Sequence, residues 1–182
     1  RYYIASYTGH TRDLDFSWKT YAAKLNKELV GILGNFIYRS LLFAYRNYGK
    51  VPSGFIEPEI EGAVKKAIED IRVYVQNYEF KKICDTLLGL AITGNKYLQE
   101  REPWKLKETD PDEARDVIHN ALWLSRAIAI LGEPVFPFHA YEVYRQLGLD
   151  GNSYSLDEAL RAVNIGRKLT KPRPLFNQLS EE

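Results

Sequence analysis

The sequence predicts an all-α fold, an antiparallel bundle of five to six helices. Three observations indicate it: apolar residues recur at helical spacing along most of the 182 residues, Pro and Gly fall between those stretches, and no alternating strand pattern competes with them. A chain with 45% hydrophobic and 27% charged residues has the composition of a compact globular domain. Each helix has one apolar stripe to bury, and a bundle buries them all.

The first half of the chain predicts three helices. The first covers residues 17–49, with a break near Asn26 and with Gly49 placed to end it. A connection rich in Pro and Gly follows, and Pro58 suits the first turn of a second helix that ends near Asn77. The third covers residues 79–101, because Pro103 forbids its continuation.

The second half predicts shorter elements after one long helix. Asp110 and Glu113 form a start signal of the capping-box kind for a fourth helix that runs to about Leu131. A fifth helix is expected over residues 137–147 and a sixth over residues 155–168. We expect residues 1–182 to form a single domain, with residues 150–182 as a C-terminal helix and extended tail that packs on it.

Charge and cysteine content narrow the class of protein. The net charge is +1, from 25 Lys plus Arg and 24 Asp plus Glu, so any contact with nucleic acid must be local. The lone cysteine, Cys84, can form no internal disulfide, which makes a cytoplasmic location the expectation. No apolar stretch approaches the roughly 18 residues that span a bilayer. The chain has no methionine, so we expect a fragment of a longer protein or a processed start.

The sequence contains no recognisable catalytic motif. It has no Gly-rich phosphate loop, no GxSxG and no HExxH, and its three histidines are too scattered to suggest a zinc site. Acidic pairs such as Asp13 with Asp15 are better interpreted as helix-start residues. We therefore expect no catalytic residue, no metal and no cofactor in this chain.

One polar stripe on the first predicted helix has two interpretations. At 100° per residue, Asn35, Arg39, Leu42 and Arg46 lie on one side, opposite the apolar face. Such a stripe is commonly just a solvated face. Alternatively, an amide and a planar guanidinium one turn apart suit the edges of unpaired bases.

Trp104 also has two interpretations. It lies in the charged segment EREPWK, which we expect to be a loop just past the end of the third helix. It either closes that helix end by packing or serves as a platform on which an unstacked base stacks. Trp123, within the fourth helix, is more easily explained as a core residue.

Three segments resemble, in order and spacing, a known family. They are DLDFSWKTYAAKLNKELVGILGNFIYR, NKYLQEREPWK and SRAIAILGEPVFP. They are similar to the C-terminal anticodon-binding domain of methionyl-tRNA synthetases of the archaeal and eukaryotic kind, and the likeness spans most of residues 1–182. LGNxxxR followed about 65 residues later by NKYxxExxPWK is the more specific pair.

The resemblance implies a function and its residues. Asn35, Arg39 and Trp104 match the family positions that contact the CAU anticodon, and Arg46 is a candidate for an additional RNA contact. The implied partners are methionine tRNA, through its anticodon stem-loop, and the parent protein's own catalytic domain, with no DNA and no membrane. The parent would be a methionine-tRNA ligase that uses ATP, with zinc as a further candidate cofactor of its catalytic domain, which has no counterpart here.

Two alternatives remain open at this point. The chain could be the equivalent bundle of another class I synthetase, or a helical module whose 13 Tyr, 8 Phe and 3 Trp dock a protein partner. The basic tail that contains Arg167, Lys168, Lys171 and Arg173 could contact the tRNA backbone or pack on the bundle. Packing is favoured because Leu175 and Phe176 supply an apolar anchor.

Overall fold

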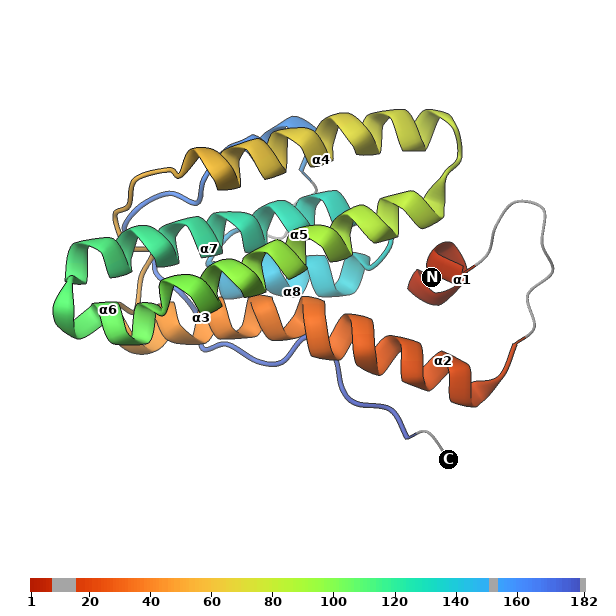
Figure 1. The fold of residues 1–182 in the computed structure, drawn as a ribbon, viewed down its shortest axis with the longest axis horizontal. Helices are drawn as coiled ribbons and strands as arrows, with labels where there is room; N and C mark the ends of the chain where they lie inside the picture. Colours follow the sequence, from red (N-terminus) through yellow and green to blue (C-terminus); the bar gives the residue numbers. More distant parts are fainter. Residues whose placement is uncertain (8–15, 151–153, 181–182) are drawn as a thin grey trace.

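The computed structural model describes residues 1–7, 16–150 and 154–180, and it confirms the predicted all-α class. Long helices lie side by side, with α4 along the top, α3 along the bottom and α5 and α7 between them (Figure 1). In chain order the elements are α1 (Tyr2–Tyr7), α2 (Trp18–Leu25), the π-helix η1 (Asn26–Gly34), α3 (Asn35–Asn47), α4 (Pro58–Gln76), α5 (Phe80–Arg101), α6 (Pro103–Thr109), α7 (Pro111–Gly132), α8 (Pro137–Gln146) and the 3-10 helix η2 (Leu156–Leu160).

The first long helix is continuous rather than broken. Ser17 caps it, its hydroxyl oxygen accepting a hydrogen bond from the Thr20 backbone N–H at 3.0 Å. At Asn26, where we expected a break, the helix widens into η1 and returns to α-helical geometry at Asn35. The predicted helix-start residues Asp13 and Asp15 lie outside the described residues.

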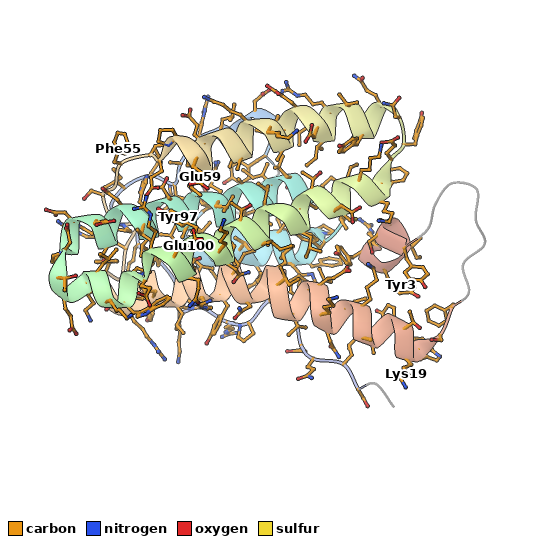
Figure 2. The ribbon with its side chains drawn as sticks, in the orientation of Figure 1. Tyr3, Lys19, Phe55, Glu59, Tyr97 and Glu100 are labelled. Atoms are coloured by element: carbon orange, nitrogen blue, oxygen red, sulfur yellow. The ribbon has the colours of Figure 1, made fainter. Side chains whose placement is uncertain are left out.

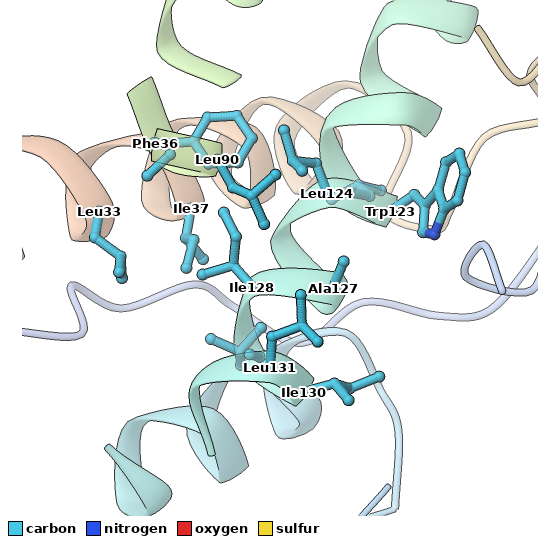
Figure 3. Packing of buried hydrophobic residues seen from close by; sticks show 14 of the residues in the cluster. Leu33, Phe36, Ile37, Leu90, Trp123, Leu124, Ala127, Ile128, Ile130 and Leu131 are labelled. Carbon is cyan, nitrogen blue, oxygen red and sulfur yellow. The ribbon is translucent and has the colours of Figure 1, made fainter. Parts of the chain in front are cut away.

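Helix α7 forms the centre of the bundle. It contacts α3, α4, α5, α6, α8 and η2, and every residue from Val117 to Gly132 is buried. Figure 3 shows Leu124, Ile128 and Leu131 of α7 packed toward Leu33, Phe36 and Ile37 of the first long helix. Burial of this apolar surface is the main stabilising contribution to the fold. Cys84 is also buried, as expected of a small core residue.

Two elements differ from the prediction. Trp104 does not lie in a loop, because Pro103 opens the short helix α6 at once. The helix expected over residues 155–168 is wrong: only η2 forms, and the backbone becomes extended at Arg161. Tertiary pairing replaces the helix there, since Lys168 forms an isolated antiparallel bridge with Lys50.

The C-terminal tail lies along the bundle. Leu175 belongs to the buried core, and the Phe176 ring stacks on the His139 imidazole with 4.3 Å between centroids. The Gln146 side chain donates to the Arg173 carbonyl at 3.1 Å and accepts from the Arg173 N–H at 3.2 Å. These contacts tie the tail to α8.

Two kinds of feature are absent from the described part of the chain. None of its helices is both long and apolar enough to cross a membrane. Within the same ranges, no three His, Cys, Asp or Glu side chains gather in a way that could hold a metal ion.

Candidate nucleic-acid interface

The outward face of α3 is polar and carries only positive charge. Asn35 and Arg46 are exposed and Arg39 is half-buried, while Phe36 and Ile37 on the opposite face are in the core. The α3 sequence, NFIYRSLLFAYRN, contains no Asp or Glu. Neither arginine forms an ion pair with any described residue, so an anion could approach this face without displacing a carboxylate.

Arg39 and Trp104 meet although they are 65 residues apart in the chain. The Arg39 guanidinium carbon lies over the Trp104 ring, 5.5 Å from its centroid, within the range of a cation–π contact. Trp104 remains 38% exposed, whereas Trp123 is buried and donates its indole N–H to the Ala159 carbonyl at 2.8 Å. The two tryptophans therefore differ as the sequence suggested.

A pocket of about 260 Å³ opens between α3 and α6 beside this contact. That volume is below the roughly 300 to 1,000 Å³ of sites that enclose drug-sized ligands, and it suits one planar group. Its walls come from four helices and combine apolar side chains with the cationic and amide groups of α3. They are Arg39, Leu42, Phe43, Arg46 and Asn47 of α3, Leu98 of α5, Pro103 and Trp104 of α6, and Ile118 of α7.

The corner between α5 and α6 fixes the position of Trp104. Glu102 takes a left-handed conformation, with φ at 44°, and turns the chain into α6. The preceding residue, Arg101, donates to Glu57 Oε2 at 2.8 Å and to Glu113 Oε1 at 3.1 Å. Arg101 thus joins the end of α5 to the residue before α4 and to the first turn of α7.

Tyr97 reinforces this corner. Figure 2 shows Tyr97 on α5, near the start of α4. Its hydroxyl donates to Glu57 Oε1 at 2.5 Å, and the Arg101 guanidinium lies 5.9 Å from its ring centroid. Burial and the hydrogen bond to the Glu57 carboxylate raise the pKa of Tyr97. The phenol therefore stays protonated, and remains a hydrogen-bond donor, at neutral and moderately alkaline pH.

Asn35 lies one turn before Arg39, outside the residues that line the pocket. Its side-chain Nδ2 is 3.5 Å from the Oδ1 of Asn95 on α5. The Asn95 Nδ2 in turn donates to the Ile32 and Ala91 carbonyls, both at 3.0 Å. Asn95 therefore orients the Asn35 amide, a role that our sequence reasoning missed, although NKY begins one of the segments that carry the resemblance.

The structure accordingly brings three of the four predicted residues to one pocket. Arg39, Arg46 and Trp104 line it, and Asn35 stands on the same face of α3 beside it. Asn47, at the end of the same wall, was not predicted. Its Nδ2 donates to the Phe43 carbonyl at 2.8 Å, which leaves its side-chain oxygen as an acceptor.

A larger and more aromatic surface lies at the other end of the molecule, near α1. A pocket of about 460 Å³ there is lined by α1, α2, η1, α8 and the tail. Beside it, the Phe16 and Trp18 rings form an edge contact at 5.0 Å, and Trp18 is 73% exposed. The protein-interaction alternative rests on the aromatic content of the whole chain, and this surface is where the structure gathers exposed aromatic rings.

Two models of known protein families match this chain, each over a different range of residues. A family model described as the anticodon binding domain of methionyl tRNA ligase matches residues 51–182, and one described as tRNA synthetases class I (M) matches residues 1–41. Trp104 lies within the first match, and Asn35 and Arg39 lie within the second.

Curated proteins and solved structures agree with these models. The chain is 43% identical over its whole length to a methionine–tRNA ligase of Methanosarcina mazei and 42% identical to that of Methanosarcina acetivorans. It spans 26% of the length of each. A crystal structure of free Mycobacterium tuberculosis methionyl-tRNA synthetase shares the fold, with a TM-score of 0.88 and 23% identity over 98% of this chain and 38% of that one.

Proposed function

The chain belongs to the family of methionyl-tRNA ligase anticodon-binding domains, and on that premise we propose that α3 and α6 together recognise the CAU anticodon of methionine tRNA. The contact of Arg39 with Trp104 at the edge of an open pocket carries this proposal. It joins a cationic, planar hydrogen-bonding group to an exposed aromatic ring, the combination that unpaired bases require.

Each side chain has its own task in this proposal. Trp104 provides a face on which an unstacked anticodon base stacks. Arg39, held against the indole, presents a planar fork of N–H donors to a base edge, and Asn35 presents an amide whose direction Asn95 sets. Arg46, at the far side of the pocket, contacts the RNA as well.

We propose further that the parent protein is a methionine-tRNA ligase that works in the cytoplasm. Its curated relatives of that name are about four times as long as this chain. A related synthetase has been solved with methionyl-adenylate, which supports the use of ATP by the parent's catalytic part. Zinc would belong to that part as well. This chain would bind the tRNA and take no part in catalysis.

The decisive experiment measures binding of a CAU stem-loop and of a single-base anticodon variant at fixed salt. Trp104→Ala should weaken binding of the CAU stem-loop by about 1 to 3 kcal/mol, the usual cost of losing a stacked base. Trp18→Ala removes an even more exposed tryptophan, which does not line the pocket, and should leave binding unchanged. Equal losses from both variants would contradict the proposal.

Two further variants separate recognition of bases from contact with phosphate. Arg39→Lys keeps the charge but loses the planar fork, so it should lower the affinity ratio between the two RNAs. Asn35→Asp keeps the size but replaces an amide donor by a negative oxygen, so it should change base preference and weaken binding together. If all variants kept the wild-type ratio, this face would not read the anticodon, and the aromatic surface near α1 would become the leading candidate site.

A further inference from the structure

Acidic residues are absent from two long segments of the chain. No Asp or Glu occurs between Glu28 and Glu57, a stretch that carries Arg39, Arg46 and Lys50. None occurs between Glu158 and Glu181 either, and that stretch carries five cations, among them Lys168. In a chain with nearly balanced charge, both segments carry positive charge only.

The fold places these two segments side by side. Lys50 and Lys168 form an isolated antiparallel bridge, flanked by hydrogen bonds from the Val51 N–H to the Arg167 carbonyl at 2.8 Å and from the Leu169 N–H to the Gly49 carbonyl at 3.1 Å. Because these bonds join the neighbours, the lysines form a non-hydrogen-bonded pair. In such pairs the Cα atoms are only about 4.5 Å apart and the side chains leave on the same face.

Repulsion between the Lys50 and Lys168 ammonium groups opposes the backbone bridge that brings these two residues together. Both lysines are exposed, and neither forms an ion pair with any residue in the described ranges. By contrast, every Lys and Arg of α4 and α5 has a carboxylate partner, as in Lys65 with Glu61 and Lys81 with Asp85. Like charges directly across a strand pair are destabilising, and a bound anion would relieve that repulsion.

Lys50 lies close in the chain to a residue of the pocket wall. Arg46 lines the pocket near the end of α3, and Lys50 follows it by four residues, so their Cα atoms are at most about 15 Å apart. Gly49, with φ at 65°, ends the helix between them. An RNA strand that left the pocket past Arg46 toward the end of α3 would approach Lys50 and, across the bridge, Lys168.

We propose that Lys50 and Lys168 form a site for the sugar-phosphate backbone of the RNA, adjacent to the anticodon pocket and independent of base identity. This inference rests on the proposed function, because the neighbouring pocket is what selects RNA among the polyanions. Arg46 would link the two parts, and Lys171, also exposed and in the same acid-free segment, would extend the site. Contacts of this kind position the RNA without reading its sequence.

Some residues of the tail pack on the bundle, while others between them face the solvent. Arg167 points inward and donates to the Gly148 carbonyl at 2.6 Å, and Leu175 is in the core. Lys168, between them in the chain, is exposed. Packing and contact with phosphate are therefore properties of different residues of one segment rather than alternatives.

The test uses the double variant Lys50→Gln, Lys168→Gln and measures stem-loop affinity over a range of salt. Loss of two phosphate contacts should reduce the slope of log K against log salt by about 1.4 to 1.8, and affinity at low salt should fall at least tenfold. The CAU stem-loop and its single-base variant should weaken by the same factor. The control, Lys65→Gln with Lys66→Gln, makes the same charge change on α4, where both lysines are paired, and should leave the slope unchanged.

The outcomes distinguish this inference from the proposed function. If the wild-type chain prefers the CAU stem-loop but the double variant keeps its slope and affinity, the lysine pair is not a phosphate site. If both double variants reduce the slope equally, charge alone explains the effect and the inference is wrong. If the wild-type chain does not distinguish the two RNAs, the proposed function fails, whatever the lysines do. Thermal melting of both variants checks that each is folded.

Discussion

At the scale of single residues, His139 links tail packing to pH. Its half-buried imidazole stacks on Phe176, and desolvation lowers the pKa of His139 below its ordinary value. The folded protein therefore binds this proton less readily than the unfolded chain does, so the contribution of His139 to stability is complete above about pH 6.5 and is lost as the pH falls below that value.

His139→Phe keeps an aromatic ring against Phe176 but cannot titrate. Between pH 7 and pH 5, the melting temperature of the wild-type chain should fall further than that of this variant. Carboxylates titrate in both proteins, so the difference between the two curves isolates His139. Parallel curves would show that the imidazole titrates as it does in the unfolded chain.

Single residues also mark the limit of what the sequence could predict. Helical spacing places Asn35, Arg39 and Arg46 on the outward face of α3, and the structure has them there. Spacing within one helix cannot show which residue of another helix lies opposite. The contact of Trp104 with Arg39 and that of Asn95 with Asn35 both cross between helices, so they needed the fold.

At the scale of helices, the boundaries given by Pro and capping residues were predicted well, and the geometry within helices was not. Asp110 caps α7 as expected, its Oδ1 accepting from the Glu113 N–H at 3.1 Å. The π-helix η1 was not predicted because the apolar spacing was compared only with the α-helical period, and the irregularity near Asn26 was interpreted as a break. Its widened turns are supported from outside by Asn95, which donates to the Ile32 carbonyl at 3.0 Å.

Helix packing gives a sharper prediction at Gly94. A Cβ there would lie 2.4 Å from the ring of Phe36, which is fully buried and has no room to move, so α3 and α5 approach closely only because Gly94 has no side chain. Gly94→Ala should lower the free energy of unfolding by about 1 to 3 kcal/mol, the usual cost of overpacking a core.

Gly89 provides the matched control on the same helix. It is exposed, and an added Cβ would meet no atom within 4 Å. Gly89→Ala should raise stability by about 0.4 to 1 kcal/mol, because alanine restricts the unfolded chain. Urea unfolding at constant m value measures both changes. A stabilised Gly94→Ala protein would show that the two helices are not in close contact at this point.

At the scale of the whole molecule, the fold class followed from the sequence because nearly every helix has one apolar face and a clear end signal. The C-terminal region did not follow. The segment around residues 155–168 has helical spacing, yet Arg126 of α7 donates to the Glu158 and Arg161 carbonyls, at 2.5 and 2.8 Å, and holds the backbone outside a helix. Long-range contacts of this kind override local propensity.

The tail provides the last test, since it joins elements that are far apart in the sequence. Removing residues 172–182 would expose the surface that Leu175 and Phe176 cover, including the side of η1 at Gly34, where an added Cβ would lie 3.0 Å from the Phe176 ring. Loss of these two side chains should lower the free energy of unfolding by about 2 to 4 kcal/mol, or roughly 4 to 16 °C in melting temperature.

The truncated chain keeps Lys50 and Lys168, so the salt dependence of its RNA binding should stay close to that of the full chain. Lys171→Gln with Arg173→Gln, in the full-length chain, is the complementary control: it removes charge from the tail without removing its apolar anchor, so its melting temperature should change little. A truncated chain that melted normally but bound RNA with a reduced salt slope would show that the tail contacts the RNA rather than stabilising the bundle.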